Sequence, residues 1–66
     1  MKNRIFNLKK EIPGGCLLEC CVTKEVNGYI VWNKEPNEDE YEFVEFFIDR
    51  DDAEDLCTEL IQSDER

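Results

Sequence analysis

Three of the four cysteines lie in one short segment, CLLECCVT at 16–23, and the fourth is Cys57. Thiolates bind metal ions and carry redox chemistry. Zinc sites, however, usually take their sulfurs from C-x2-C turns, and this chain has neither such a pair nor a histidine. We therefore predict no metal site and no cofactor. Reduced cysteine packs as a small hydrophobe, and we assign the sulfurs mainly to the core.

The positions of the cysteines along a strand support that assignment. Cys20 and Cys21 are neighbours, so their side chains should point to opposite faces and cannot easily share one metal ion. We expect Cys16, Cys20 and Cys57 in the core, and Cys21 on the other face of the sheet. A disulfide from Cys57 to Cys20 or Cys16 is geometrically conceivable but unnatural in a reducing compartment.

Carboxylates are the second group that could carry a function. The segment DRDDAEDLCTE at 49–59 resembles the alternating acids of a calcium loop, but it lacks the glycine that such a loop needs for its sharp turn. Paired-carboxylate hydrolysis needs a pocket, which a chain of 66 residues hardly has room for. We therefore predict no catalytic residue. Two interpretations of these acids stay open. They stabilise a helix by lying at the positive end of its dipole, or they form a protein-binding surface.

The net charge of −9 is unevenly distributed and indicates the kind of partner. Residues 1–34 carry six basic and three acidic side chains, whereas residues 35–66 carry two basic and fourteen acidic ones. The acidic half would repel nucleic acid and anionic membranes and attract a protein with a basic surface. We predict an acidic ridge that imitates the phosphates of nucleic acid. Its residues are Asp51, Asp52, Asp55, Glu59, Glu38, Asp39 and Glu40.

The elements that must position these groups fit one small domain, residues 1–66. The longest apolar run near the start of the chain is too short for a signal peptide, and no run approaches the roughly 18 residues of a membrane span. We expect a cytoplasmic protein with reduced thiols. The predicted fold class is α+β: an antiparallel meander of three strands, or four, with one C-terminal amphipathic helix on one face.

Turn residues and periodicity divide the chain further. Residues 1–12 form an N-terminal arm or a first strand, and Pro13 and Gly14 make a turn. The meander spans 16–49, and its clearest strand is YEFVEFFID at 41–49. A helical stripe of apolar residues predicts the helix at 50–62, with Asp49 or Asp51 as its cap, and 63–66 form a frayed tail.

The dipeptide Asn27-Gly28 predicts a hairpin turn. A three-residue loop with Gly28 in the left-handed conformation would set Val22 opposite Trp32 and gather apolar residues on one face, so we prefer it to a two-residue loop. The helix should then cover the following residues. They are Leu18, Cys20, Val22, Ile30, Trp32, Val44, Phe46 and Ile48.

In this register the opposite face is unusually apolar for a solvated sheet face. Either the N-terminal arm, with Ile5, Phe6 and Leu8, folds across it, or the face associates with a partner or a second copy. We predict the following self-association residues. They are Tyr41, Phe43, Phe47, Val31 and Leu17.

Together these features predict a small, non-enzymatic, protein-binding module, an inhibitor or adaptor that sets its acidic ridge against a basic, nucleic-acid-binding protein. The alternative is a structural domain that forms a homodimer through the aromatic sheet face.

Overall fold

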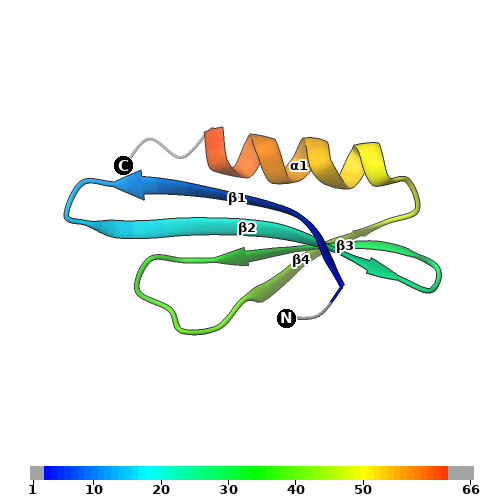
Figure 1. The fold of residues 1–66 in the computed structure, drawn as a ribbon, viewed down its shortest axis with the longest axis horizontal. Coiled ribbons are helices and arrows are strands. Elements are labelled where there is room, and N and C mark those ends of the chain that lie inside the picture. Colours follow the sequence, from blue (N-terminus) through cyan, green and yellow to red (C-terminus); the bar gives the residue numbers. More distant parts are fainter. Residues whose placement is uncertain (1–2, 63–66) are drawn as a thin grey trace.

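A four-stranded antiparallel sheet and one C-terminal helix make up the fold, as Figure 1 shows. The computed structural model describes residues 3–62, so the predicted tail at 63–66 lies outside the described residues. The elements are β1 (Arg4–Ile12), β2 (Cys16–Glu25), β3 (Gly28–Lys34), β4 (Glu42–Phe47) and α1 (Arg50–Gln62). The strands follow one another in the sheet in chain order, which confirms the predicted α+β meander with its helix.

The N-terminal segment forms the first strand of the sheet. β1 pairs with β2 along nearly its whole length, with Phe6 opposite Val22 and Leu8 opposite Cys20. The predicted turn connects the two strands, and Gly14 there has a φ of 104°, which glycine adopts without strain. The segment therefore extends the sheet at its edge instead of folding across the open face.

The turn between β2 and β3 differs from both predicted loops. Glu25 pairs with Gly28, and Val26 and Asn27 form the turn. Neither Asn27 nor Gly28 has a positive φ. Gly28 is required for another reason: a Cβ atom there would lie 2.4 Å from the backbone oxygen of Phe47 and 2.7 Å from the ring of Phe46.

This register corrects the predicted faces, because a shift of one residue turns each side chain of a strand to the other side. Val22 lies opposite Val31, and both are fully buried. Val31 is therefore beneath the helix, where it was not expected. Ile30 and Trp32, which were predicted beneath the helix, lie on the opposite face.

A bulge in β4 completes the rearrangement. Glu45 pairs with Val31 and Phe43 with Trp32, so Val44 is the extra residue between them. Val44 and Phe47 pack against the core beneath α1, as predicted for Val44 but not for Phe47.

Two further residues predicted beneath the helix are exposed. Phe46 pairs with Ile30 on the opposite face and is 42% exposed, and Ile48, beyond the end of β4, is 77% exposed.

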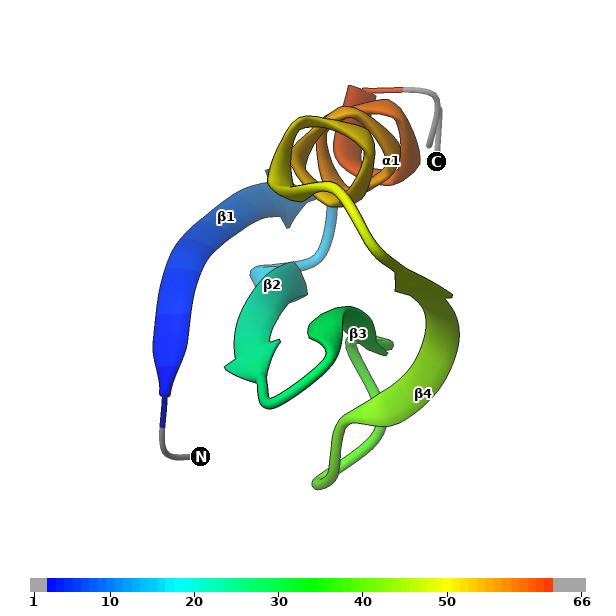
Figure 2. The same ribbon diagram turned by 90° about the vertical axis from the view of Figure 1, so that its right-hand side faces the viewer.

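The core lies between α1 and the sheet. α1 runs along the strands on one side of the sheet, as Figures 1 and 2 show together. Ala53, Cys57 and Ile61 recur every fourth residue and form its buried stripe. They pack on Leu18, Cys20, Val22 and Val31. Each fully buried leucine, isoleucine or valine side chain stabilises such a fold by about 1.5–3 kcal/mol before chain entropy is subtracted.

Candidate interaction surfaces

The outward face of α1 presents a row of carboxylates. Asp51, Asp55 and Glu59 follow one another at four-residue intervals and are exposed, as is Asp52 beside them. Successive members are about 6 Å apart along the helix axis. Within residues 3–62, none of these four carboxylates forms a salt bridge, whereas Glu54 pairs with Arg50. We call Asp51, Asp52, Asp55 and Glu59 the helix acids; they are free to meet a partner's cations.

Part of this acidic row also stabilises the helix. Asp51 and Asp52 lie in its first turn, and Asp49 occupies the position before it, where its backbone oxygen accepts a hydrogen bond from Ala53 N. Acids at a helix N-terminus are each worth typically about 0.3–1 kcal/mol. Asp55 and Glu59 lie beyond that turn, so an interaction with the helix dipole does not explain why these two positions are acidic.

The remaining predicted ridge residues lie elsewhere. Glu38, Asp39 and Glu40 are exposed in the connector between β3 and β4, residues 35–41. Figures 1 and 2 show this connector on the side of the sheet away from α1. The helix acids and these connector acids are therefore two separate surfaces, and the single continuous ridge expected from the sequence does not form.

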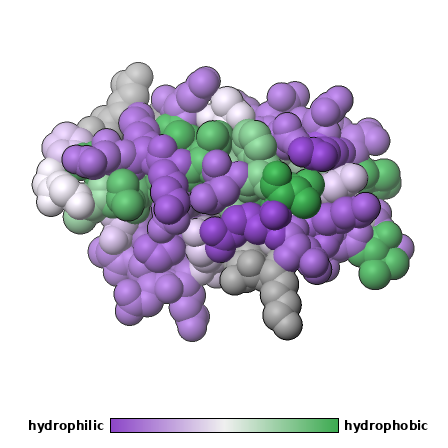
Figure 3. Space-filling view, viewed as in Figure 1, coloured by the Kyte–Doolittle hydropathy of each residue, from purple (hydrophilic) through white to green (hydrophobic). Residues whose placement is uncertain are grey.

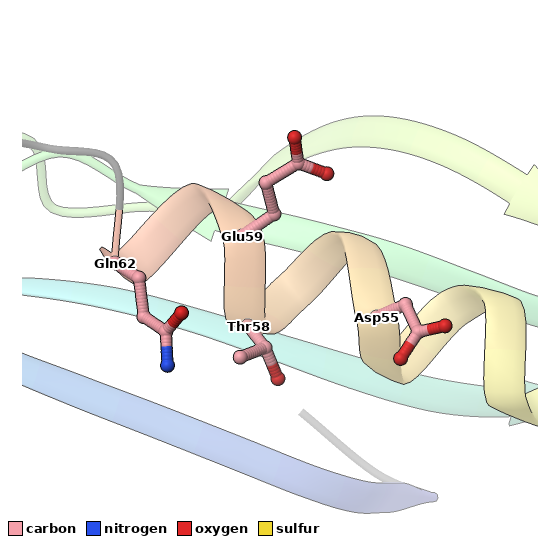
Figure 4. Close-up of a pocket in the computed structure, with 4 residues that line it drawn as sticks. All are labelled: Asp55, Thr58, Glu59 and Gln62. Carbon is pink, nitrogen blue, oxygen red and sulfur yellow. The ribbon is translucent and has the colours of Figure 1, made fainter.

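The hollow on the surface of α1 does not gather the carboxylates. It is lined by Asp55, Thr58, Glu59 and Gln62. Figure 4 shows the side chains of Asp55 and Glu59 projecting away from one another. Two carboxylates that diverge in this way do not flank a common substrate atom, which is what paired-acid catalysis needs.

Hydrophobic residues also reach the surface. Figure 3 shows a band of them across the middle of a mostly hydrophilic face. The helix and β1 contribute partly buried residues that pack on the core, among them Phe6, Leu8, Leu56 and Leu60. These side chains pack against the buried core cluster, so they belong to the core rather than to a binding site.

The sheet face opposite α1 carries a second, smaller cluster. Trp32 donates a hydrogen bond from Nε1 to Thr23 Oγ1 at 2.8 Å, and Thr23 donates to Glu25 Oε2 at 3.1 Å. Thr23 is only 2% exposed, so this chain of bonds satisfies a buried hydroxyl. The ring of Phe43 packs edge-on against Trp32, with centroids 6.1 Å apart.

Tyr41 ties the connector to this face. Its hydroxyl donates to Glu19 Oε1 at 3.0 Å, and the guanidinium of Arg4 lies 5.3 Å from the centre of its ring. Lys9 and Lys34 approach the same Glu19 carboxylate at 3.9 and 3.6 Å. Burial, together with the hydrogen bond to Glu19 and the charge of Glu19, raises the pKa of Tyr41.

The predicted self-association residues are now divided between two sides. Phe43 is 58% exposed and Leu17 41% exposed on the face opposite α1, and Tyr41 packs on the same face. Val31 and Phe47 belong to the core beneath α1, which corrects their predicted place. The sequence interpretation missed Trp32 and Phe46, because the register it preferred turned both toward the helix.

The cysteines are free thiols, and three of them are buried. The Cys20 thiol hydrogen-bonds to Cys57 across the core, and this bond and burial raise the pKa of Cys20. Burial also raises the pKa of Cys21, which is fully buried although it lies on the face opposite α1. Cys16 is exposed, which corrects its predicted place in the core. Buried thiols whose pKa is raised are poor nucleophiles.

Neither metal binding nor a membrane span is indicated by the described part of the chain. Among residues 3–62, no group of three or more cysteine, aspartate or glutamate side chains is arranged to hold a metal ion. No helix in the same range is long and apolar enough to cross a membrane. Comparison with protein-family models, curated proteins and solved structures finds no match to this chain.

Proposed function

We propose that this protein is a small, non-enzymatic, protein-binding module, an inhibitor or adaptor, that contacts the basic surface of a partner protein through the helix acids. One observation carries the proposal. The four exposed carboxylates of the helix acids have no salt-bridge partner in residues 3–62. Two of them, Asp55 and Glu59, lie after the first turn of α1, where acids no longer stabilise the helix through its dipole.

Electrostatics supports a partner whose natural ligand is nucleic acid. Acids four residues apart on α1 are about 6 Å apart along the helix axis, which is comparable with the separation of successive phosphates along one strand of a nucleic acid. A basic groove built for phosphates would therefore meet carboxylates at a suitable spacing on α1. Complementary charge chiefly speeds association, and it makes binding sensitive to salt.

A tagged pull-down from native lysate tests this function. The protein should recover a basic protein that handles nucleic acid, and both high salt and added DNA should displace that partner. Recovery of partners that resist both treatments would contradict binding through the helix acids.

A second candidate function is self-association through the sheet face opposite α1. The observation that favours it is the exposure of Phe43 and Phe46, at 58% and 42%, on one face of an edge strand. A solvated sheet face is normally polar, and no described segment covers these two rings. Light scattering over a concentration series tests it: a dimer is expected, and a strict monomer would exclude it.

A further inference from the structure

The outer edge of β4 is open. In the order β1-β2-β3-β4, β4 pairs only with β3 within residues 3–62, so no described strand lies along its other side. The backbone N–H and C=O groups of such an edge can pair with a strand added from another chain. The side chains of β4 then decide which kind of strand fits.

The bulge at Val44 places the two acids of β4 on one side of the sheet. Glu42 and Glu45 are three residues apart, and in a regular strand they would point to opposite faces. With Val44 as the extra residue, they lie opposite Asn33 and Val31 of β3, which are only two residues apart. Both carboxylates are therefore on the α1 side, at the spacing of alternate strand residues, about 6.7 Å.

The same bulge aligns two aromatic rings on the other side of β4. Phe43 and Phe46 lie opposite Trp32 and Ile30, which are again two residues apart in β3. Both rings are exposed. A strand added at this edge would therefore meet two carboxylates along one of its faces and two aromatic rings along the other.

The two carboxylates have no cation of their own. Glu42 and Glu45 are exposed, and neither forms a salt bridge within residues 3–62. By contrast, Lys9 on the other edge strand, β1, already approaches Glu19 of the same chain at 3.9 Å. Unpaired acids at an open edge repel the same edge of a second copy and attract a basic strand.

We propose that the edge of β4 binds an extended segment of the partner protein in which lysine or arginine alternates with apolar residues. The segment adds a fifth strand to the sheet. Its basic side chains lie beside Glu42 and Glu45, and its apolar side chains pack on Phe43 and Phe46. The inference rests on the proposed function for the basic charge of the partner, and it adds a second contact site to the helix acids.

A synthetic peptide tests this site without the partner. The probe is a peptide of about six residues, the usual length of a strand, in which lysine alternates with valine. Titration into isotope-labelled protein, followed by NMR, should change the amide signals of β4 and slow their hydrogen exchange, while α1 changes little. A peptide with glutamate in place of lysine should not bind. Neither should the lysine peptide with methylated backbone nitrogens, which keeps its charge but has no N–H to donate.

Two double variants identify the acids that meet the peptide. Glu42→Gln with Glu45→Gln removes two charges from β4 and should weaken peptide binding about tenfold at low salt, because two pairs of opposite charge are lost. Glu38→Gln with Glu40→Gln removes two charges from the connector and should leave the affinity unchanged. All four side chains are exposed, so both variants should fold, which circular dichroism checks.

Several results would overturn the β4 site and leave the proposed function standing. They are no binding of the lysine peptide, signal changes confined to α1, equal binding of the methylated peptide, or an equal loss of affinity in both double variants. Protection of β4 that needs no peptide and grows with protein concentration would show that a second copy occupies the edge, and it would also overturn the site.

The proposed function can fail separately from the β4 site. Peptide binding at β4, together with a pull-down that recovers no salt-sensitive basic protein, would support the edge as a peptide site and refute the role of the helix acids.

Discussion

In this protein, residues of the same type occupy different environments, and the packing partners of a side chain decide which environment it has. Cys20 and Cys21 are adjacent and equally buried, yet one joins the core beneath α1 and the other the cluster on the opposite face. Cys16, only a few residues earlier, is exposed. The sulfurs therefore divide into three packed thiols and one accessible thiol, which a reagent can distinguish.

Thiol labelling gives the first prediction. In the folded protein a water-soluble thiol reagent should modify one cysteine rapidly, and all four should react after denaturation. The reason is that burial hides the other three and raises the pKa of Cys20 and Cys21. Mass spectrometry should place the rapid label on Cys16. Rapid labelling of Cys20 or Cys57 in the native state would contradict the packing described.

Thr23 gives a second prediction at the same scale. Thr23→Val removes the acceptor of the Trp32 N–H and should lower the free energy of unfolding by about 1 kcal/mol, the typical net worth of such a hydrogen bond, because the Trp32 donor is only partly buried. Thr23→Ser keeps the hydroxyl and should lose less. Urea denaturation of both variants measures the difference, and a valine variant as stable as the serine variant would show that the bond is not needed.

At the scale of elements, the sequence predicts what depends on local pattern. The apolar stripe of α1 and the turn at Pro13 and Gly14 are both found where expected, because each depends on nearby residues alone. The register of β2 and β3 could not be predicted in this way. Asn27-Gly28 has the signature of a hairpin turn, but Gly28 is needed for the close approach of β4, a contact that is distant in sequence.

This single misplaced turn accounts for most of the wrong face assignments. The predicted loop placed Ile30 and Trp32 beneath the helix and Val31 on the opposite face, which is the reverse of their observed positions. The bulge at Val44 then changes which residues of β4 point to each face. The helix acids are exposed as the helical period predicts. Their separation from the connector acids depends on how the sheet lies between them, which local patterns do not contain.

The role of Gly28 can be tested by adding one methyl group. Gly28→Ala would bring a Cβ atom within 2.4 Å of a backbone oxygen in β4, so the strand pair must shift. We expect a loss of about 1–3 kcal/mol in the free energy of unfolding, as for other overpacked sites. Gly15→Ala is a useful comparison, because its Cβ meets no atom within 4 Å and its cost comes only from a φ of 81°. Equal stability of Gly28→Ala and the wild type would refute the close approach.

The connector offers a prediction on pH. The surroundings of Tyr41 in the folded protein raise its pKa, so the folded state holds the proton of the hydroxyl more tightly than the unfolded state does. This contribution is present below the pKa of free tyrosine, about 10, and is lost as the pH rises through the higher pKa of the folded state. The stability advantage of the wild type over Tyr41→Phe should therefore shrink above about pH 10. Urea denaturation of both proteins along a pH series measures it, and a constant difference would contradict the burial of Tyr41.

At the scale of the whole molecule, function is proposed from two surfaces on opposite sides of one sheet. The helix acids lie on one side, and the sheet face with Trp32 and Phe43 lies on the other, as do the connector acids. Self-association through the face opposite α1 would leave both helices on the outside. The two proposed interactions are therefore compatible, and a dimer would present two sets of helix acids to a partner.

The separation of the acids also provides a matched control for the proposed function. Asp51→Asn, Asp55→Asn and Glu59→Gln together remove three negative charges from α1. Glu38→Gln, Asp39→Asn and Glu40→Gln remove the same number from the connector, on the other side of the sheet. Both triple variants have the same net charge, so any difference between them reports position and not charge alone.

The most direct measurement compares the binding of these two triple variants to the partner recovered from lysate, at low and at high salt. We expect the α1 variant to lose most of its low-salt affinity and much of its salt dependence, while the connector variant binds nearly as the wild type does. Equal binding by the wild type and the α1 variant, or an equal loss in both triple variants, would contradict recognition through the helix acids.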